Sequence, residues 1–145
     1  MKKGISLIEI LVVLVIISII ASFSLPAIHK ARLKGLITKT KTTIDSLEAA
    51  LSMYETDFGD YPESDGTGSK VLYQFLVGPI DDENWKGPYI RLRKQDIDEE
   101  GNIVDAWNNP IIYKYPQEEY ENTPYIIFSF GPDGKKNTKD DIGNW

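Results

Sequence analysis

The chain has 145 residues, with 22 aspartate and glutamate residues against 16 lysine and arginine residues, and its formal net charge is −6. This acidic balance is not that of a protein that binds nucleic acid. The chain contains no cysteine, which excludes a disulfide framework and a thiolate metal site. Beyond the apolar N-terminal segment about 115 residues remain, enough for one small domain with its own core but not for two.

The N-terminus joins a short basic segment to a long apolar one. Lys2 and Lys3 precede Gly4, and the apolar stretch of 21 residues from Ile5 to Leu25 contains one charged residue, Glu9. As a helix this stretch would cover about 30 Å, one thickness of membrane hydrocarbon. A carboxylate at the centre of a bilayer costs about 2.5 kcal/mol or more, so its presence indicates a function.

Two ordinary explanations of the apolar stretch fit less well. A secretory signal peptide has an apolar core of about 7 to 15 residues and then a small-residue cleavage site. This stretch is longer, and Ala21-Ser22-Phe23 is a poor cleavage site. A plain membrane anchor fits the length but leaves Glu9 unexplained.

Gly4 followed five residues later by Glu9 resembles the class III signal of type IV prepilins and pseudopilins. The resemblance implies that a prepilin peptidase cuts between Gly4 and Ile5 on the cytoplasmic side, that Ile5 is then N-methylated, and that Glu9 is retained. Ile5 departs from the Phe or Met more common in that family. The resemblance also implies that Glu9 pairs with the N-terminal amine of a neighbouring subunit during filament assembly. Such pairing in a low dielectric offsets much of the cost of burying either charge.

Charge is segregated along the chain. Residues 42–145 hold 9 basic and 21 acidic side chains, whereas residues 27–41 hold no acid and five basic side chains: Lys30, Arg32, Lys34, Lys39 and Lys41. The positive-inside rule would place this basic cluster in the cytoplasm, but the leader motif requires the short N-terminal side to be there. We follow the motif and expect a single-pass inner-membrane protein with a cytoplasmic N-terminus and a periplasmic C-terminal domain. The basic cluster could then serve subunit contacts along a filament.

Beyond the apolar stretch, further apolar residues recur at intervals of three and four, which predicts that one helix continues to about Thr56 and packs one face on a sheet. The residues of this stripe are Leu33, Leu36, Ile37, Ile44, Leu47, Leu51, Tyr54 and Phe58. Gly59 is placed to cap the helix, with Pro62 shortly after it.

The remaining segments predict short elements joined by loops. Residues 63–69 and 81–89 are expected to be loops, and residues 70–77 a second helix. Residues 89–93 and 102–105 are expected to pair across a Gly101-Asn102 turn, and the strongest strand predictions, rich in Ile, Tyr and Phe, are 111–115 and 124–130.

The order of several short motifs resembles the major, G-type pseudopilins of type II secretion systems over nearly the whole chain. These motifs are Tyr54-x-x-Asp57 with Tyr61-Pro62, Gly87-Pro88-Tyr89, Asp105-Ala106-Trp107-Asn108-Asn109-Pro110, Ser129-Phe130-Gly131-Pro132-Asp133-Gly134, Asp140-Asp141 and the terminal Asn144-Trp145. Ala106 and Asn108 depart from the family pattern, and residues 91–104 look like an insertion.

The resemblance implies an α+β, type IV pilin-like fold, in which a long N-terminal helix, transmembrane in its first half, packs on a small antiparallel sheet. The expected division is a leader peptide at 1–4, a transmembrane and assembly segment at 5–26, and a periplasmic globular domain at 27–145.

Asp133, Asp140 and Asp141 are the candidate metal ligands, because carboxylate oxygens on a flexible loop suit Ca²⁺. The resemblance implies one calcium ion here, held by these side chains and by the carbonyls of Phe130 and Gly143. The loop is not an EF-hand, since Lys135 and Thr138 stand where that loop needs other residues. The alternative is a solvated acidic turn, partly neutralised by its lysines.

An enzyme is the rival class. The only histidine, His29, lies at the membrane edge, and the chain has neither a cysteine nucleophile nor a Gly-x-Ser-x-Gly motif. The acidic pairs Asp81-Asp82 and Glu99-Glu100 are typical of solvated loops. We therefore expect no enzymatic activity.

The resemblance implies a structural subunit that forms a helical homopolymer, a pseudopilus, and so helps to export folded proteins across the outer membrane. The implied partners are other copies of the chain, minor pseudopilins, an inner-membrane assembly platform and the prepilin peptidase. The alternative is a type IV pilus subunit for adhesion, motility or DNA uptake, although many such pilins close a C-terminal loop with a disulfide. A membrane-anchored hydrolase is a more distant possibility.

Overall fold

A computed structural model describes residue 4 and residues 6–145, with side chains for all of these except residues 23–26. The predicted leader residues 1–3 and the predicted methylation site Ile5 lie outside the described residues. The chain divides into two compact units, Met1–Gly35 and Leu36–Trp145. The predicted division at residues 4 and 26 concerns processing and membrane insertion, and it stays a prediction.

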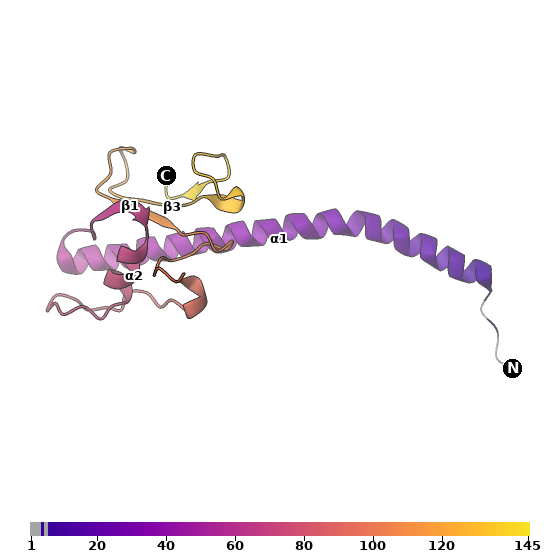
Figure 1. Ribbon diagram of the computed structural model, residues 1–145, viewed down its shortest axis with the longest axis horizontal. Coiled ribbons are helices and arrows are strands. Elements are labelled where there is room, and N and C mark those ends of the chain that lie inside the picture. Colours follow the sequence, from indigo (N-terminus) through magenta and orange to yellow (C-terminus); the bar gives the residue numbers. More distant parts are fainter. Residues whose placement is uncertain (1–3, 5) are drawn as a thin grey trace. The chain divides into compact units, whose positions relative to one another are not determined.

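The first element is one long helix, α1 (Leu7–Phe58), which runs through residue 26 without interruption (Figure 1). Between Leu7 and Ile20 its large apolar side chains are 47% to 84% exposed. By length and composition α1 is a candidate membrane-spanning helix, and none of its most apolar window is buried within the protein. Its end confirms the prediction, because Gly59 has a left-handed φ of 79° and its N–H donates to the Glu55 carbonyl at 2.7 Å.

The predicted apolar stripe of α1 is buried over its later part. Ile44, Leu47 and Leu51 are at most 3% exposed, and Ile37 packs at the edge of the same core. Leu33, in contrast, is 42% exposed and lies in the first compact unit. The prediction is therefore confirmed from Ile37 onward and wrong at Leu33, because periodicity marks a face of a helix but not where its partner begins.

The sheet has four antiparallel strands in the order β1-β2-β3-β4 and lies along the second half of α1 (Figure 1). The strands are β1 (Ser64–Gly68), β2 (Ile112–Tyr115), β3 (Ile126–Ser129) and β4 (Ile142–Gly143). The strand predictions at 111–115 and 124–130 are confirmed by β2 and β3.

Both faces of the two central strands are covered. Tyr113 and Ile127 point into the main core beside α1. Their neighbours Ile112, Ile126 and Phe128 form a second buried cluster on the opposite face, as the period of two along a strand requires. The sheet is thus apolar on both sides at its centre, which explains why residues 111–113 and 125–128 are continuous apolar runs.

The predicted loop at 63–69 is wrong, because Ser64–Gly68 form the edge strand β1. Ser64 pairs with Tyr115 and Asp65 with Lys114, and the register then shifts before Gly68. Polar residues and glycines give little local strand signal, so pairing with β2 decides the conformation.

The predicted pairing of 89–93 with 102–105 is also wrong. Residues 89–93 form no strand, and segment 102–105 makes only isolated bridges. The Asp98 carboxylate accepts the Asn102 N–H at 2.8 Å and closes a tight turn before the segment. Side-chain hydrogen bonds of this kind compete with a strand ladder.

The second helix, α2 (Lys70–Val77), confirms the prediction at 70–77. Its first turn has a distant cap, since Oδ1 of Asn102 accepts the N–H groups of Ser69 at 3.1 Å and Lys70 at 3.2 Å. Asn102 is 8% exposed. The loop before β2 is therefore fixed to the start of α2, which is why residues 102–105 do not pair as a hairpin.

Two of the sequence motifs meet at the end of α1. Asp57 accepts hydrogen bonds from Lys86 Nζ at 3.0 Å and from the Tyr89 hydroxyl at 2.8 Å. The lysine first, and then the tyrosine, hold the pKa of the Asp57 carboxyl below its usual value. The Tyr89 ring lies edge-on to Tyr54, with centroids 5.9 Å apart. The loop at 81–89, predicted as such, is thus tied to α1.

Candidate functional site

The assembly segment predicted at the N-terminus lies at the start of α1. Glu9 is in the first turn and exposed, and its N–H donates to the Ser6 carbonyl at 3.0 Å. A carboxylate there is favoured by the partial positive charge of the helix N-terminus. Gly4 has no described atom near the position that a Cβ would take. The fold of the described residues therefore does not require glycine at position 4.

The three predicted calcium ligands lie on one loop between β3 and β4. The loop starts with a 3₁₀ turn, η2 (Gly131–Asp133), and ends at Ile142. The Asp133 N–H donates to Asp140 Oδ2 at 3.2 Å, and the Asn137 N–H donates to Asp141 Oδ2 at 2.8 Å. A Cβ on Gly131 would overlap the Asp140 carbonyl oxygen, so glycine lets the two ends of the loop approach.

The Thr138 hydroxyl stands where the three carboxylates converge. Its oxygen lies 2.6 Å from Asp140 Oδ1, 3.2 Å from Asp141 Oδ1 and 3.4 Å from Asp133 Oδ1. A hydroxyl has one proton and can donate to one of them at a time. The hydrogen bond from Thr138 holds the pKa of the Asp140 carboxyl below its usual value. Three negative groups therefore converge on a hydroxyl that can donate to only one of them, and Asp133 Oδ1 also accepts the Lys135 N–H at 2.8 Å.

This donor set suits a hard cation, although the loop is not arranged as a finished metal centre. Within the described parts of the chain, no group of three or more His, Asp or Glu side chains could hold a metal ion as placed. Phe130 directly precedes η2, and Gly143 lies in β4, where it pairs with Phe128. Their carbonyls flank the loop, and their role as ligands stays a prediction. Oxygen ligands are what Ca²⁺ would use, and glycine at position 131 lets the two ends of the loop approach each other.

A buried carboxylate that the sequence did not single out as a site supports the base of this loop. Asp105 is 3% exposed, and its Oδ2 accepts the Ser129 hydroxyl at 2.6 Å. Ser129 Oγ in turn accepts the Gly131 N–H at 3.0 Å, at the start of η2. Asp105 Oδ1 accepts the N–H groups of Trp107 and Asn109 at 2.8 and 2.9 Å. The sequence signal that could have indicated this role is an aspartate directly before a polar turn, because such aspartates often accept hydrogen bonds from the backbone of the turn.

Replacing Asp105 with alanine is expected to lower the free energy of unfolding by about 2–4 kcal/mol. The reason is that a buried hydroxyl and two backbone N–H groups lose their acceptor, and each unsatisfied group costs about 1–3 kcal/mol. Urea unfolding of the full chain in detergent, followed by circular dichroism, measures the change.

The matched control is Asp65→Ala. Asp65 also accepts from a residue two positions on, Thr67, but it is exposed. A much smaller loss is expected there. Equal losses in the two variants would show that the turn, and not the buried network, is what Asp105 stabilises.

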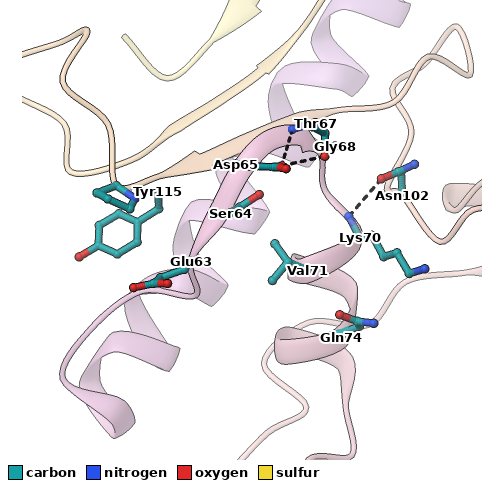
Figure 2. A pocket seen from close by; sticks show the side chains of 11 residues that line it. Glu63, Ser64, Asp65, Thr67, Gly68, Lys70, Val71, Gln74, Asn102 and Tyr115 are labelled. Carbon is teal, nitrogen blue, oxygen red and sulfur yellow. Dashed lines mark hydrogen bonds between the residues drawn. The ribbon is translucent and has the colours of Figure 1, made fainter.

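A separate open cleft lies beside β1 and the start of α2 (Figure 2) and has a volume of about 570 Å³. Figure 2 shows Asp65 bonded to Thr67 and Asn102 bonded to the Lys70 backbone. These side chains hold the local backbone in place. The cleft is thus lined by groups with structural roles.

The fold now defines a class of protein. An exposed apolar start to a long helix, with a small antiparallel sheet along its later half, is the α+β architecture of pilin-like subunits. The family model described as type II secretion system (T2SS), protein G, matches residues 27–145, and that of the prokaryotic N-terminal methylation motif matches residues 1–25. The chain belongs to the type II secretion system protein G family.

Similar proteins agree with this assignment. The type II secretion system core protein G of Pseudomonas aeruginosa is 33% identical, over 99% of this chain and 95% of that protein. That of Vibrio cholerae is 34% identical, over 99% of this chain and 92% of its own length. The crystal structure of the major pseudopilin from the type 2 secretion system of enterohaemorrhagic Escherichia coli is similar, with 28% identity, a TM-score of 0.50, and coverage of 81% of this chain and 92% of that one. The predicted class is confirmed, and the type IV pilus alternative is not favoured.

Proposed function

We propose that the chain is the structural subunit of a type II secretion pseudopilus, and that copies polymerise into a periplasmic filament that helps to export folded proteins across the outer membrane. Family membership supports this role. The observation that carries it is the exposed apolar surface of α1 from Leu7 to Ile20. Such a surface needs a cover, and lipid before assembly and other copies after assembly would provide it.

Before assembly the chain is a single-pass inner-membrane protein, with its N-terminus in the cytoplasm and its C-terminal domain in the periplasm. The candidate span in α1 and the match to the N-methylation motif over residues 1–25 support this placement. The partners are the prepilin peptidase, the inner-membrane assembly platform and minor pseudopilins.

Processing removes residues 1–4 and methylates Ile5, and the new N-terminal amine of one copy then pairs with Glu9 of a neighbour. Two observations support this step. Glu9 is exposed on the first turn of α1, so a neighbouring chain can reach its carboxylate. Packing among the described residues does not require glycine at position 4, as expected if glycine is there because a peptidase recognises it.

One calcium ion on the loop after β3 stabilises the C-terminal part of the domain. The convergence of Asp133, Asp140 and Asp141 on one hydroxyl supports this proposal. The carbonyls of Phe130 and Gly143 would complete the shell. Bound calcium would neutralise the carboxylates and hold together a tail with little apolar content.

The family consists of structural pseudopilins, and the absence of enzymatic activity in this chain stays a prediction. Deleting the gene from its own organism is expected to leave the folded substrates of the secretion system in the periplasm. Immunoblots of culture medium against periplasm measure this, with the wild-type gene restored as control. Normal secretion together with loss of adhesion or motility would instead support a pilus subunit.

A further inference from the structure

Exposed positive charge follows the apolar part of α1. Lys30 and Arg32 are exposed and lie within the first compact unit. Residues 27–41 contain no acidic side chain that could neutralise them. Neither the fold of the domain nor the proposed calcium loop accounts for this charge.

The spacing from the apolar stretch places these charges within reach of the lipid headgroups. Lys30 and Arg32 come five and seven residues after Leu25, about 8 and 11 Å along a helix. The headgroup layer on each side of a bilayer is about 5–7 Å thick, and long basic side chains extend back toward it. Lys39 and Lys41 come about 21 and 24 Å after the stretch, beyond that layer and a Debye length of about 8 Å.

The two charges lie on opposite sides of the helix. At about 100° per residue, Lys30 and Arg32 project about 200° apart. A partner protein docked on one side would meet a stripe along one face. Lipid surrounds a single helix on all sides, so charges on opposite sides fit a lipid partner better.

We propose that Lys30 and Arg32 form a collar that binds the phosphate groups of anionic phospholipids, in the leaflet at the C-terminal end of the apolar stretch. The proposal rests on the membrane insertion of α1 included in the proposed function. Each basic side chain near an anionic surface contributes about fivefold to lipid binding. The collar would hold the subunit at a fixed depth before assembly and would exchange lipid for other contacts on extraction.

The test uses the full-length chain in nanodiscs that contain equal amounts of phosphatidylglycerol and phosphatidylcholine. Native mass spectrometry gives the ratio of the two lipids that remain bound. Wild type is expected to retain phosphatidylglycerol with at least fivefold preference in dilute ammonium acetate. It is expected to lose most of this preference in 1 M ammonium acetate, because the Debye length is then only about 3 Å.

Two double variants with the same loss of charge separate the collar from general attraction. Lys30→Gln with Arg32→Gln is expected to bring the lipid ratio close to one. Lys39→Gln with Lys41→Gln, on the same helix but further from the membrane, is expected to keep the wild-type ratio. No preference in wild type, or equal losses in the two double variants, would overturn the proposal.

Two further measurements test whether the chain inserts into the membrane and whether the collar contacts a second copy of the chain. Flotation with vesicles checks insertion, and a wild-type chain that does not float would refute the proposed membrane location as well as the collar. Because the chain has no cysteine, Ala31→Cys gives a single cross-linking position. Disulfide dimers in phosphatidylcholine alone, abolished by the Lys30 and Arg32 changes, would assign the collar to a second copy of the chain and overturn lipid binding.

Discussion

Replacing Glu9 with alanine is expected to leave the chain in the membrane and processed, but to abolish its assembly into filaments. The carboxylate lies on the exposed first turn of α1, within the apolar stretch that would face lipid. In the membrane it is a cost, and in the filament we expect it to pair with the amine of a neighbour.

The expected effect is large because the substitution acts on both states. Removing the acid stabilises the membrane-inserted chain by about 2.5 kcal/mol, and it removes the charge pair from the filament. The first contribution alone shifts the balance against assembly by roughly 70-fold. Restoring a carboxylate with Glu9→Asp is expected to recover assembly in part.

Sheared filaments counted by immunoblotting and electron microscopy measure assembly, and flotation measures insertion. The matched control is Ser18→Ala, which also removes a polar group from the apolar stretch. The Ser18 hydroxyl donates to the Leu14 carbonyl of its own helix at 2.8 Å, so normal assembly is expected. Normal filaments from Glu9→Ala would refute the pairing mechanism.

Replacing Asp140 and Asp141 together with asparagine is expected to lower the melting temperature of the full chain only when Ca²⁺ is present. At a free calcium concentration 100 times the dissociation constant, wild type should gain roughly 10 °C over its value in chelator. The double variant should gain almost nothing, because calcium binding depends on carboxylate charge.

Asparagine is chosen because it keeps an oxygen that can accept the hydrogen bonds made in the absence of metal. Those bonds come from the N–H groups of Asp133 and Asn137. The Thr138 hydroxyl also donates to Asp140, and in the variant the side-chain amide N–H can donate to the oxygen of that hydroxyl instead. In chelator the variant should therefore melt no lower than wild type, since it also has fewer converging negative charges. A variant that loses as much stability in chelator as in calcium would refute the metal site.

The matched control changes the acidic pair Glu99 and Glu100 to glutamine. They are adjacent acids, like Asp140 and Asp141, but they are exposed and lie before β2. Differential scanning calorimetry in calcium and in chelator should give the wild-type shift for this control. A reduced shift would indicate that overall charge, and not the loop, governs the response.

The helices were predictable because their signals are local. Apolar spacing and the glycine at 59 place the end of α1, and the short apolar face of residues 70–77 gives α2. Their capping was not predictable, because the first turn of α2 depends on Asn102, a residue brought there by the fold. The stripe on α1 similarly gave a face but not the position, near Ile37, at which burial starts.

The sequence indicated which acidic residues share the loop after β3, but not how they are arranged there. Three aspartates within nine residues, Asp133 to Asp141, indicated cation chemistry. Nothing in the local sequence places the Thr138 hydroxyl between them. Nor did it show that Asp105, far away along the chain, supports the loop through Ser129.

By itself the sequence determined the class of protein, since its signal is local: a glycine, an acid five residues later and an apolar stretch. It also determined both helices and the central strands β2 and β3, because the apolar pattern of neighbouring residues predicts them. Only the tertiary structure decided that polar Ser64–Gly68 is an edge strand and that residues 102–105 lie against α2. The physical reason is that an edge strand or a distant helix cap gains its hydrogen bonds from residues elsewhere in the chain. The residues of the strand or the helix end therefore need not show a sequence pattern that predicts these bonds.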